Sequence, residues 1–80
     1  MKREEIFSLV RNSVAKVLHR NAEDFGENEN LMRLGITSIE VTSIITAIKK
    51  RIKVSMNPVA LFEYKTIGEF VEYLVQLDNK

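Results

Sequence analysis

The sequence of 80 residues contains no cysteine and only one histidine, His19. Without cysteine the chain can have no disulfide framework, no thiolate metal site and no cysteine nucleophile. General-base catalysis by an imidazole would depend on His19 alone. A small domain with so few catalytic side chains is a poor candidate for an enzyme. We therefore expect a protein on which enzymes act.

Long apolar runs are also absent. No segment approaches the roughly 18 to 20 apolar residues of a membrane span, and no apolar core of a secretory signal follows the charged N-terminal segment. The 12 basic and 11 acidic residues leave a formal net charge of +1, which gives no strong attraction to nucleic acid or to an acidic membrane. The sequence predicts a soluble, cytoplasmic protein with a single domain over residues 1–80.

Apolar residues recur at helical spacing in three long segments. The first covers residues 3–19 and has His19 in its last turn, where a histidine complements the helix dipole. The second covers residues 38–53 and is rich in β-branched residues, which are mediocre helix formers, so tertiary packing must hold it. The third begins at a capping box formed by Thr66 and Glu69. The three apolar stripes are Ile6, Leu9, Val10, Val14, Val17 and Leu18; Val41, Ile44, Ile45, Ile48 and Ile52; and Ile67, Phe70, Val71, Leu74 and Leu77.

Two further segments connect these helices. Residues 21–36 form a long polar connection, in which Gly35 supplies a backbone conformation that a residue with a Cβ would resist. Asn57 and Pro58 are suited to a helix cap and a first helical position, which predicts a short helix over residues 58–63. No segment shows the alternation of a strand flanked by hairpin signals. We therefore predict an all-α, four-helix bundle with three main helices, one short helix and a long first loop. Four apolar residues should anchor that loop to the core: Phe25, Leu31, Leu34 and Ile36.

Ser38, at the start of the second predicted helix, is the most informative residue of the chain. Thr37 and Glu40 form an S/T-x-x-E capping box, which fixes the helix start and leaves Ser38 in an exposed first turn. An anion bonded to the Ser38 hydroxyl would meet free backbone N–H groups and the positive end of the helix dipole. On chemistry alone, the simpler interpretation is favoured: a small polar residue near a helix cap.

Two motifs change this balance because they resemble those of the acyl carrier protein family. Residues 31–39 (LMRLGITSI) are similar to the family motif L-x-x-L-G-x-D-S-[LI]. Residues 61–67 (LFEYKTI) are similar to the run L-F-E-x-P-T-[IL] of carriers in polyketide and nonribosomal peptide assembly lines. Both motifs occur in register, with a helix before, between and after them. The resemblance covers residues 5–76.

The resemblance implies that Ser38 is the attachment point for 4′-phosphopantetheine, which is joined through a phosphodiester and ends in a thiol. The reactive sulfur would arrive with this prosthetic group, and acyl substrates would be carried as thioesters. The protein would be a non-catalytic monomer. Its partners would be a phosphopantetheinyl transferase and an acyltransferase, ketosynthase or other assembly-line enzymes, and it would bind neither nucleic acid nor a membrane.

The resemblance also gives roles to residues around the attachment point. Gly35 would keep the backbone compact, so that a modifying enzyme can approach, and Thr37 would cap the helix. Ile39, Leu61 and Phe62 would line an apolar surface that contacts the arm or its cargo. For these three residues, packing in the core is an equally supported alternative.

Departures from the family pattern concern the partners. Thr37 replaces the usual aspartate, which should affect folding little but puts in doubt any recognition of that carboxylate. On the second helix Glu40 is retained, whereas Ser43, Lys49 and Lys50 replace the acidic residues that dock partners of fatty acid synthesis. Since charge complementarity governs encounter and discrimination, partners that read an acidic stripe should bind weakly.

The subtype depends on two further features. Residues 61–66 resemble the assembly-line run, in which Lys65 replaces a common proline while Thr66 still caps the next helix. Ile36 stands where peptidyl carriers have the second of two glycines, so the balance favours a polyketide-type carrier. A peptidyl or aminoacyl carrier and a fatty-acid-synthesis carrier remain alternatives. Outside the family, the alternatives are an unmodified helical interaction module and a DNA-binding domain built on the basic end of the second helix. The position of Met1 just before the first helix suggests a natural short chain, with an excised domain as the alternative.

Overall fold

The protein is a bundle of four α-helices, seen in a computed structural model that describes residues 1–53, 55–57 and 59–79, apart from the side chain of Met32. Within these residues no strand occurs, and one isolated bridge joins Asn30 to Thr66. The prediction of an all-α bundle is therefore confirmed. The helices are α1 (Arg3–Leu18), α2 (Ser38–Arg51), α3 (Ala60–Glu63) and α4 (Ile67–Asp78), with two 3-10 helices, η1 (Ala22–Asp24) and η2 (Leu31–Leu34), between α1 and α2.

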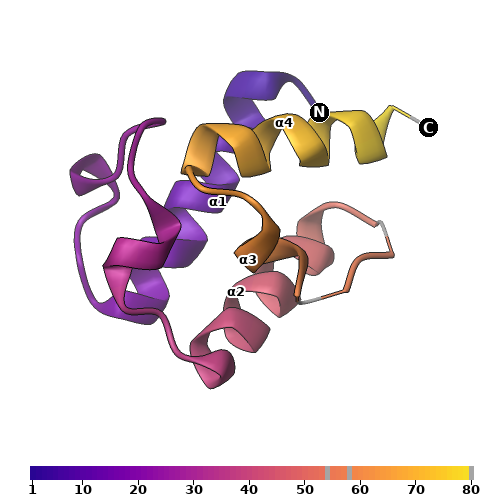
Figure 1. The fold of residues 1–80 in the computed structure, drawn as a ribbon. Coiled ribbons are helices and arrows are strands. Elements are labelled where there is room, and N and C mark those ends of the chain that lie inside the picture. The colour runs from indigo at the N-terminus through magenta and orange to yellow at the C-terminus, as the bar shows by residue number, and fades with distance from the viewer. Residues whose placement is uncertain (54, 58, 80) are drawn as a thin grey trace.

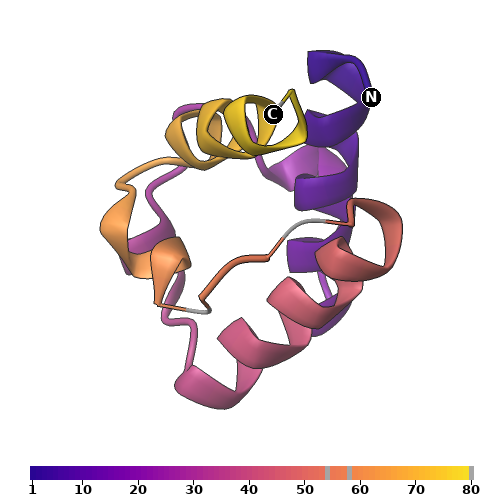
Figure 2. The ribbon, with the colours of Figure 1, turned by 90° about the vertical axis from the view of Figure 1, so that its right-hand side faces the viewer.

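Helix α1 packs against both α2 and α4, while α3 contacts η2 (Figures 1 and 2). The predicted apolar stripes supply most of the core, because each places its large side chains on one helical face. The stripe residues of α2 are all buried, together with Ile52 just after it, and those of α4 are buried as far as Leu74. At the edges of the core, Leu9, Val17, Leu18 and Leu77 are half-buried.

The helix ends differ from the predicted ones at three places. Helix α1 ends at Leu18, and His19 follows it in the left-handed conformation, with φ 57° and ψ 46°, so the prediction that His19 lies in the last turn is wrong. Helix α2 ends two residues before Lys53, because Ile52 is extended. The short helix α3 begins at Ala60. Its predicted first residue, Pro58, lies outside the described residues.

The N-cap of α3 is Val59 and not the predicted Asn57, but Asn57 still accepts hydrogen bonds at the entrance to this helix. The side-chain oxygen Oδ1 of Asn57 accepts a hydrogen bond from the backbone N–H of Val59 at 2.9 Å. Its carbonyl oxygen accepts another from the N–H of Ala60, also at 2.9 Å. Asn57 therefore satisfies donors at the entrance to α3 that have no partner within the helix.

The long connection between α1 and α2 is held by apolar anchors and by backbone hydrogen bonds. Phe25 and Leu31 are buried in the core as predicted, and Leu34 and Ile36 are half-buried against it. The guanidinium of Arg20 lies over the Phe25 ring, 4.9 Å from its centroid. A connection of this length is therefore ordered by contacts that continue the core.

The same connection is tied to the start of α4. The N–H groups of Ile67 and Gly68 donate to the carbonyl oxygens of Glu29 and Glu27, at 3.1 and 2.9 Å. In the opposite direction, the N–H of Leu31 donates to the carbonyl oxygen of Lys65, just before α4, at 2.9 Å. A Cβ at position 68 would lie 3.1 Å from the Glu27 carbonyl oxygen, so glycine permits this close approach.

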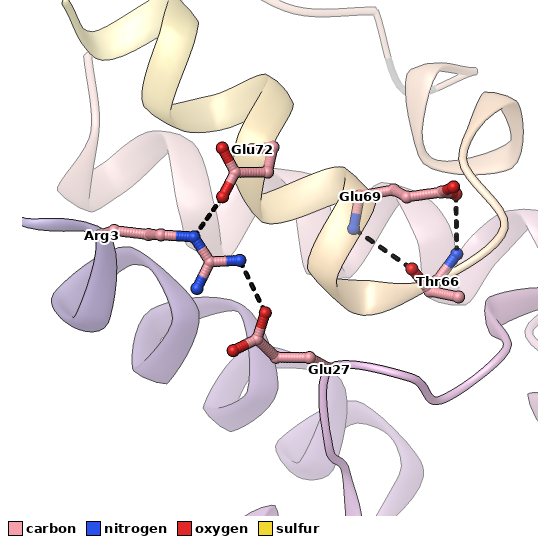
Figure 3. A network of polar contacts seen from close by, with 5 residues as sticks. All are labelled: Arg3, Glu27, Thr66, Glu69 and Glu72. Carbon is pink, nitrogen blue, oxygen red and sulfur yellow. Dashed lines mark hydrogen bonds and ion pairs between the residues drawn. The ribbon is translucent and has the colours of Figure 1, made fainter.

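An exposed polar network joins three segments at this place (Figure 3). The Arg3 guanidinium of α1 donates to Glu27 of the connection at 2.6 Å and to Glu72 of α4. The hydrogen bond from Arg3 lowers the pKa of the Glu27 carboxyl. At the start of α4, Thr66 and Glu69 form the predicted capping box, with the Glu69 N–H donating to Thr66 Oγ1 at 3.2 Å. These contacts fix where the connection meets α4.

Candidate functional site

The first turn of α2 is built by the capping box that the sequence predicts. The Glu40 N–H donates to Thr37 Oγ1 at 3.2 Å, and the Thr37 N–H donates to Glu40 Oε1 at 2.8 Å. Thr37 has an extended backbone, with φ −83° and ψ 166°, as a helix N-cap requires. Ser38 is then the first helical residue and is exposed to solvent. The cap therefore holds Ser38 in an exposed position at the start of the helix.

The electrostatic surroundings of Ser38 favour an anion. The N–H of Glu40 is used in the capping box. The N–H of Val41 donates to the carbonyl oxygen of Thr37 at 2.9 Å. The N–H groups of Ser38 and Ile39 form no hydrogen bond with the described residues. Unpaired N–H groups at the positive end of a helix dipole stabilise a negatively charged group placed beside them.

Gly35 shapes the approach to this turn. Its φ of 69° lies in the left-handed region, where a residue with a Cβ is disfavoured by about 1–2 kcal/mol. A Cβ built at this position would meet no atom within 4 Å. Glycine is therefore needed here for its backbone conformation and not for space, in agreement with the sequence analysis.

The predicted arm-contact residues have very different exposure. Ile39, next to Ser38 on α2, is 81% exposed, and Phe62 on α3 is 43% exposed. Leu61 is only 1% exposed and belongs to the core. In this conformation Ile39 and Phe62 can meet a ligand or partner, whereas Leu61 performs the packing role given above as its alternative.

The predicted docking residues lie along α2. Glu40, Ser43 and Lys50 line one groove between α1 and α2, and Lys49 is exposed beside it. The α1 wall of this groove includes Lys16 and His19, among others. Sequence reasoning did not connect the α1 residues with α2, because no local pattern shows which helices pack together.

The hydrogen bond from the Glu40 N–H to Thr37 should contribute to the stability of the fold. Replacing Thr37 with alanine should lower the free energy of unfolding by about 1 kcal/mol, because the N–H of Glu40 would lose its partner. Thr42→Ala is a matched control on the same helix. Its hydroxyl donates to the Ser38 carbonyl oxygen at 3.1 Å, a contact that does not help a helix. Urea denaturation followed by circular dichroism measures both, and an unchanged midpoint for Thr37→Ala would contradict the cap.

Among the described residues, none of the helices is long and apolar enough to span a membrane, and no group of three or more potential metal ligands is present. The search of the curated proteins finds no match to the chain. A scan against protein families finds the model described as "Phosphopantetheine attachment site" over residues 8–74. The chain therefore belongs to the phosphopantetheine-binding acyl carrier protein family, whose domains carry a covalently attached 4′-phosphopantetheine.

Proposed function

We propose that the chain carries acyl intermediates as thioesters on a 4′-phosphopantetheine arm attached to the hydroxyl of Ser38. The main support is the position of Ser38, exposed as the first residue of α2 beside a capping box that holds the helix start in place. In this function the protein is a non-catalytic carrier. It presents the arm to a phosphopantetheinyl transferase and then to biosynthetic enzymes.

The residues around Ser38 suit this prosthetic group. Its phosphodiester would lie at the positive end of α2, beside the N–H groups of Ser38 and Ile39, which have no hydrogen-bond partner within the described part of the chain. The exposed side chains of Ile39 and Phe62 could contact the apolar parts of the arm or its cargo. The chain has no cysteine, so the thiol that forms the thioester would come from the bound group.

Within the family, we infer a polyketide-type role from the sequence around α3 and α2. Residues 61–67 are similar to the assembly-line run, and Ile36 departs from the paired glycines of peptidyl carriers. Lys49 and Lys50 replace the acidic residues that fatty-acid-synthesis partners recognise. A phosphopantetheine-loaded chain should accept a malonyl-type unit from a polyketide acyltransferase. Acceptance of an aminoacyl unit instead would contradict the subtype and leave the carrier function intact.

Loading can be tested directly. The purified chain is incubated with coenzyme A and a phosphopantetheinyl transferase of broad specificity, and its intact mass is recorded. We expect a gain of one phosphopantetheinyl group per chain, because the hydroxyl of Ser38 is the single proposed acceptor. A reaction without enzyme is the control. A chain that stays unmodified, while a known carrier in the same reaction is loaded, would contradict the proposal.

A further inference from the structure

The charge on the exposed face of α2 changes from acidic at its start to basic at its end. Glu40 is the only acidic residue of the helix, and three hydroxyl residues follow it on the exposed face. The last turn then carries Lys49, Lys50 and Arg51, and Lys53 follows just beyond the helix. The hydroxyl residues are Thr42, Ser43 and Thr46, whose spacing with positions 39, 49 and 50 places them in one row.

Four residues of this row, Thr42, Ser43, Thr46 and Lys50, lie on the α2 wall of the groove between α1 and α2. The groove has a volume of about 590 Å³ and runs from Glu40 to Lys50 along α2. Lys16 lies on the opposite wall, on α1, and the half-buried Val17 and Ala47 add apolar surface. We call this surface the basic groove and define it by Lys16, Val17, Ser43, Thr46, Ala47 and Lys50.

Among the residues that line the groove only Glu40 is acidic; it lies at the opposite end from Lys50, and its carboxylate accepts the N–H of Thr37. Neither Lys16 nor Lys50 forms an ion pair with the described residues, and the same is true of Lys49. Elsewhere, Arg3 forms ion pairs with two glutamates, and Nε of Arg20 lies 3.8 Å from Oδ2 of Asp24. The helix dipole favours cations near a C-terminus, but it does not supply the carboxylates that would neutralise them. Their charge remains available to a partner.

We propose that the basic groove docks an acidic surface of a partner protein, with carboxylates that face Lys16 and Lys50. Ser43 and Thr46 offer hydroxyl groups for hydrogen bonds to the same carboxylates, and Val17 and Ala47 offer a small apolar contact. This proposal rests on the proposed function, in which the partners are enzymes that act on the arm. It specifies the charge of the partner surface, which the carrier function alone leaves open.

The position of Lys50 also determines how far the partner's carboxylates should lie from the start of α2. Lys50 lies twelve positions after Ser38 along α2, and a helix rises about 1.5 Å per residue, so the two residues lie roughly 18 Å apart. A partner that places its active site near the start of α2 would therefore carry its carboxylates about that far away. A protein surface fits this mixed row of hydroxyl, apolar and cationic groups better than a lipid surface, which would require a broad apolar face.

The test uses an isotope-labelled chain without the arm and follows its backbone amides by nuclear magnetic resonance. The probe is an amphipathic helical peptide with glutamates on one face, and its control has glutamine at each of these positions. We expect the acidic peptide to shift the amides of Ser43, Thr46 and Lys50. The shifts should disappear near 1 M salt, where the Debye length is about 3 Å.

Charge reversal provides the matched variants. Lys16→Glu/Lys50→Glu should weaken binding of the acidic peptide by roughly tenfold or more, because both lysines lie at the groove. Lys2→Glu/Lys65→Glu makes the same change in net charge at exposed positions outside the groove and should weaken it less than about twofold. Equal weakening by both variants would overturn the proposal, since it would show an effect of net charge alone.

Two further results would contradict the proposed docking of an acidic partner at the basic groove. Absence of shifts at the groove, or binding of the chain to phosphatidylserine vesicles but not to the acidic peptide, would overturn the proposal. The peptide experiment does not involve the Ser38 hydroxyl. A chain that is loaded with phosphopantetheine but does not bind the peptide would refute only the basic groove. A chain that binds the peptide but cannot be loaded would refute only the carrier function.

Discussion

Replacing Phe25 with alanine is expected to lower the free energy of unfolding by about 3–5 kcal/mol. The Phe25 ring is fully buried, although it comes from the connection between α1 and α2 and not from a main helix. Removing it would leave a cavity in the core and take away the surface on which the Arg20 guanidinium rests. Since small domains are stable by only about 5–15 kcal/mol, much of the total stability would be lost.

Phe62→Ala is the matched control for this prediction. It removes the same side chain from α3, where the ring is 43% exposed, and should cost about 1 kcal/mol or less. Urea denaturation of both variants, followed by helical circular dichroism, gives the comparison. Equal costs for the two variants would contradict the view that the long connection is held by its own part of the core.

Replacing Ser38 with alanine is expected to abolish loading with phosphopantetheine and to leave the fold intact. The hydroxyl is the proposed acceptor, so no phosphodiester can form without it. Stability should change by less than about 0.5 kcal/mol, because Ser38 is exposed and Thr37 supplies the cap. The prediction separates chemistry from folding: loading disappears while the helical spectrum and the melting temperature stay the same.

The control for Ser38→Ala is Ser8→Ala. Ser8 is also an exposed helical serine, but it lies on α1 and outside the basic groove. Its replacement should leave loading by the same phosphopantetheinyl transferase within about twofold of the wild type, which is a small effect on the free-energy scale of recognition. Loss of loading in both variants would point to damage to the surface that the enzyme recognises, and would remove the support for Ser38 as acceptor.

The parts of the fold that depend on local sequence could be predicted. Both capping boxes need only two residues three positions apart, and the structure has them at Thr37–Glu40 and Thr66–Glu69. The apolar stripes likewise predicted the buried faces of α2 and α4. Such features are fixed by helical geometry within a few residues, so the chain alone determines them.

Features that depend on tertiary contacts could not be predicted in the same way. The left-handed conformation of His19 ends α1, although a histidine in a last helical turn would also suit the dipole. The hydrogen bonds between residues 27–31 and residues 65–68 join segments far apart in sequence, and the close approach of Gly68 to Glu27 explains that glycine. No periodicity in the chain indicates such a contact.

The candidate site likewise contains some features that the local sequence predicts and others that depend on how the helices pack. Ser38, Thr37 and Gly35 are contiguous, and their geometry follows from one cap and one left-handed residue. The basic groove instead combines residues of α1 and α2, so Lys16 gained a possible role only when the packing of these helices was known. The exposure of Ile39 and the burial of Leu61 also required the structure, since both are apolar residues next to helix starts.

The most direct test of the account is to locate the modification. The chain loaded from coenzyme A is digested, and the peptides are fragmented in a mass spectrometer to find the residue that carries the added group. We expect phosphopantetheine on Ser38, at the first position of α2, and on no other hydroxyl. A group found on Ser43, Ser55 or any threonine, with Ser38 unmodified, would contradict this expectation.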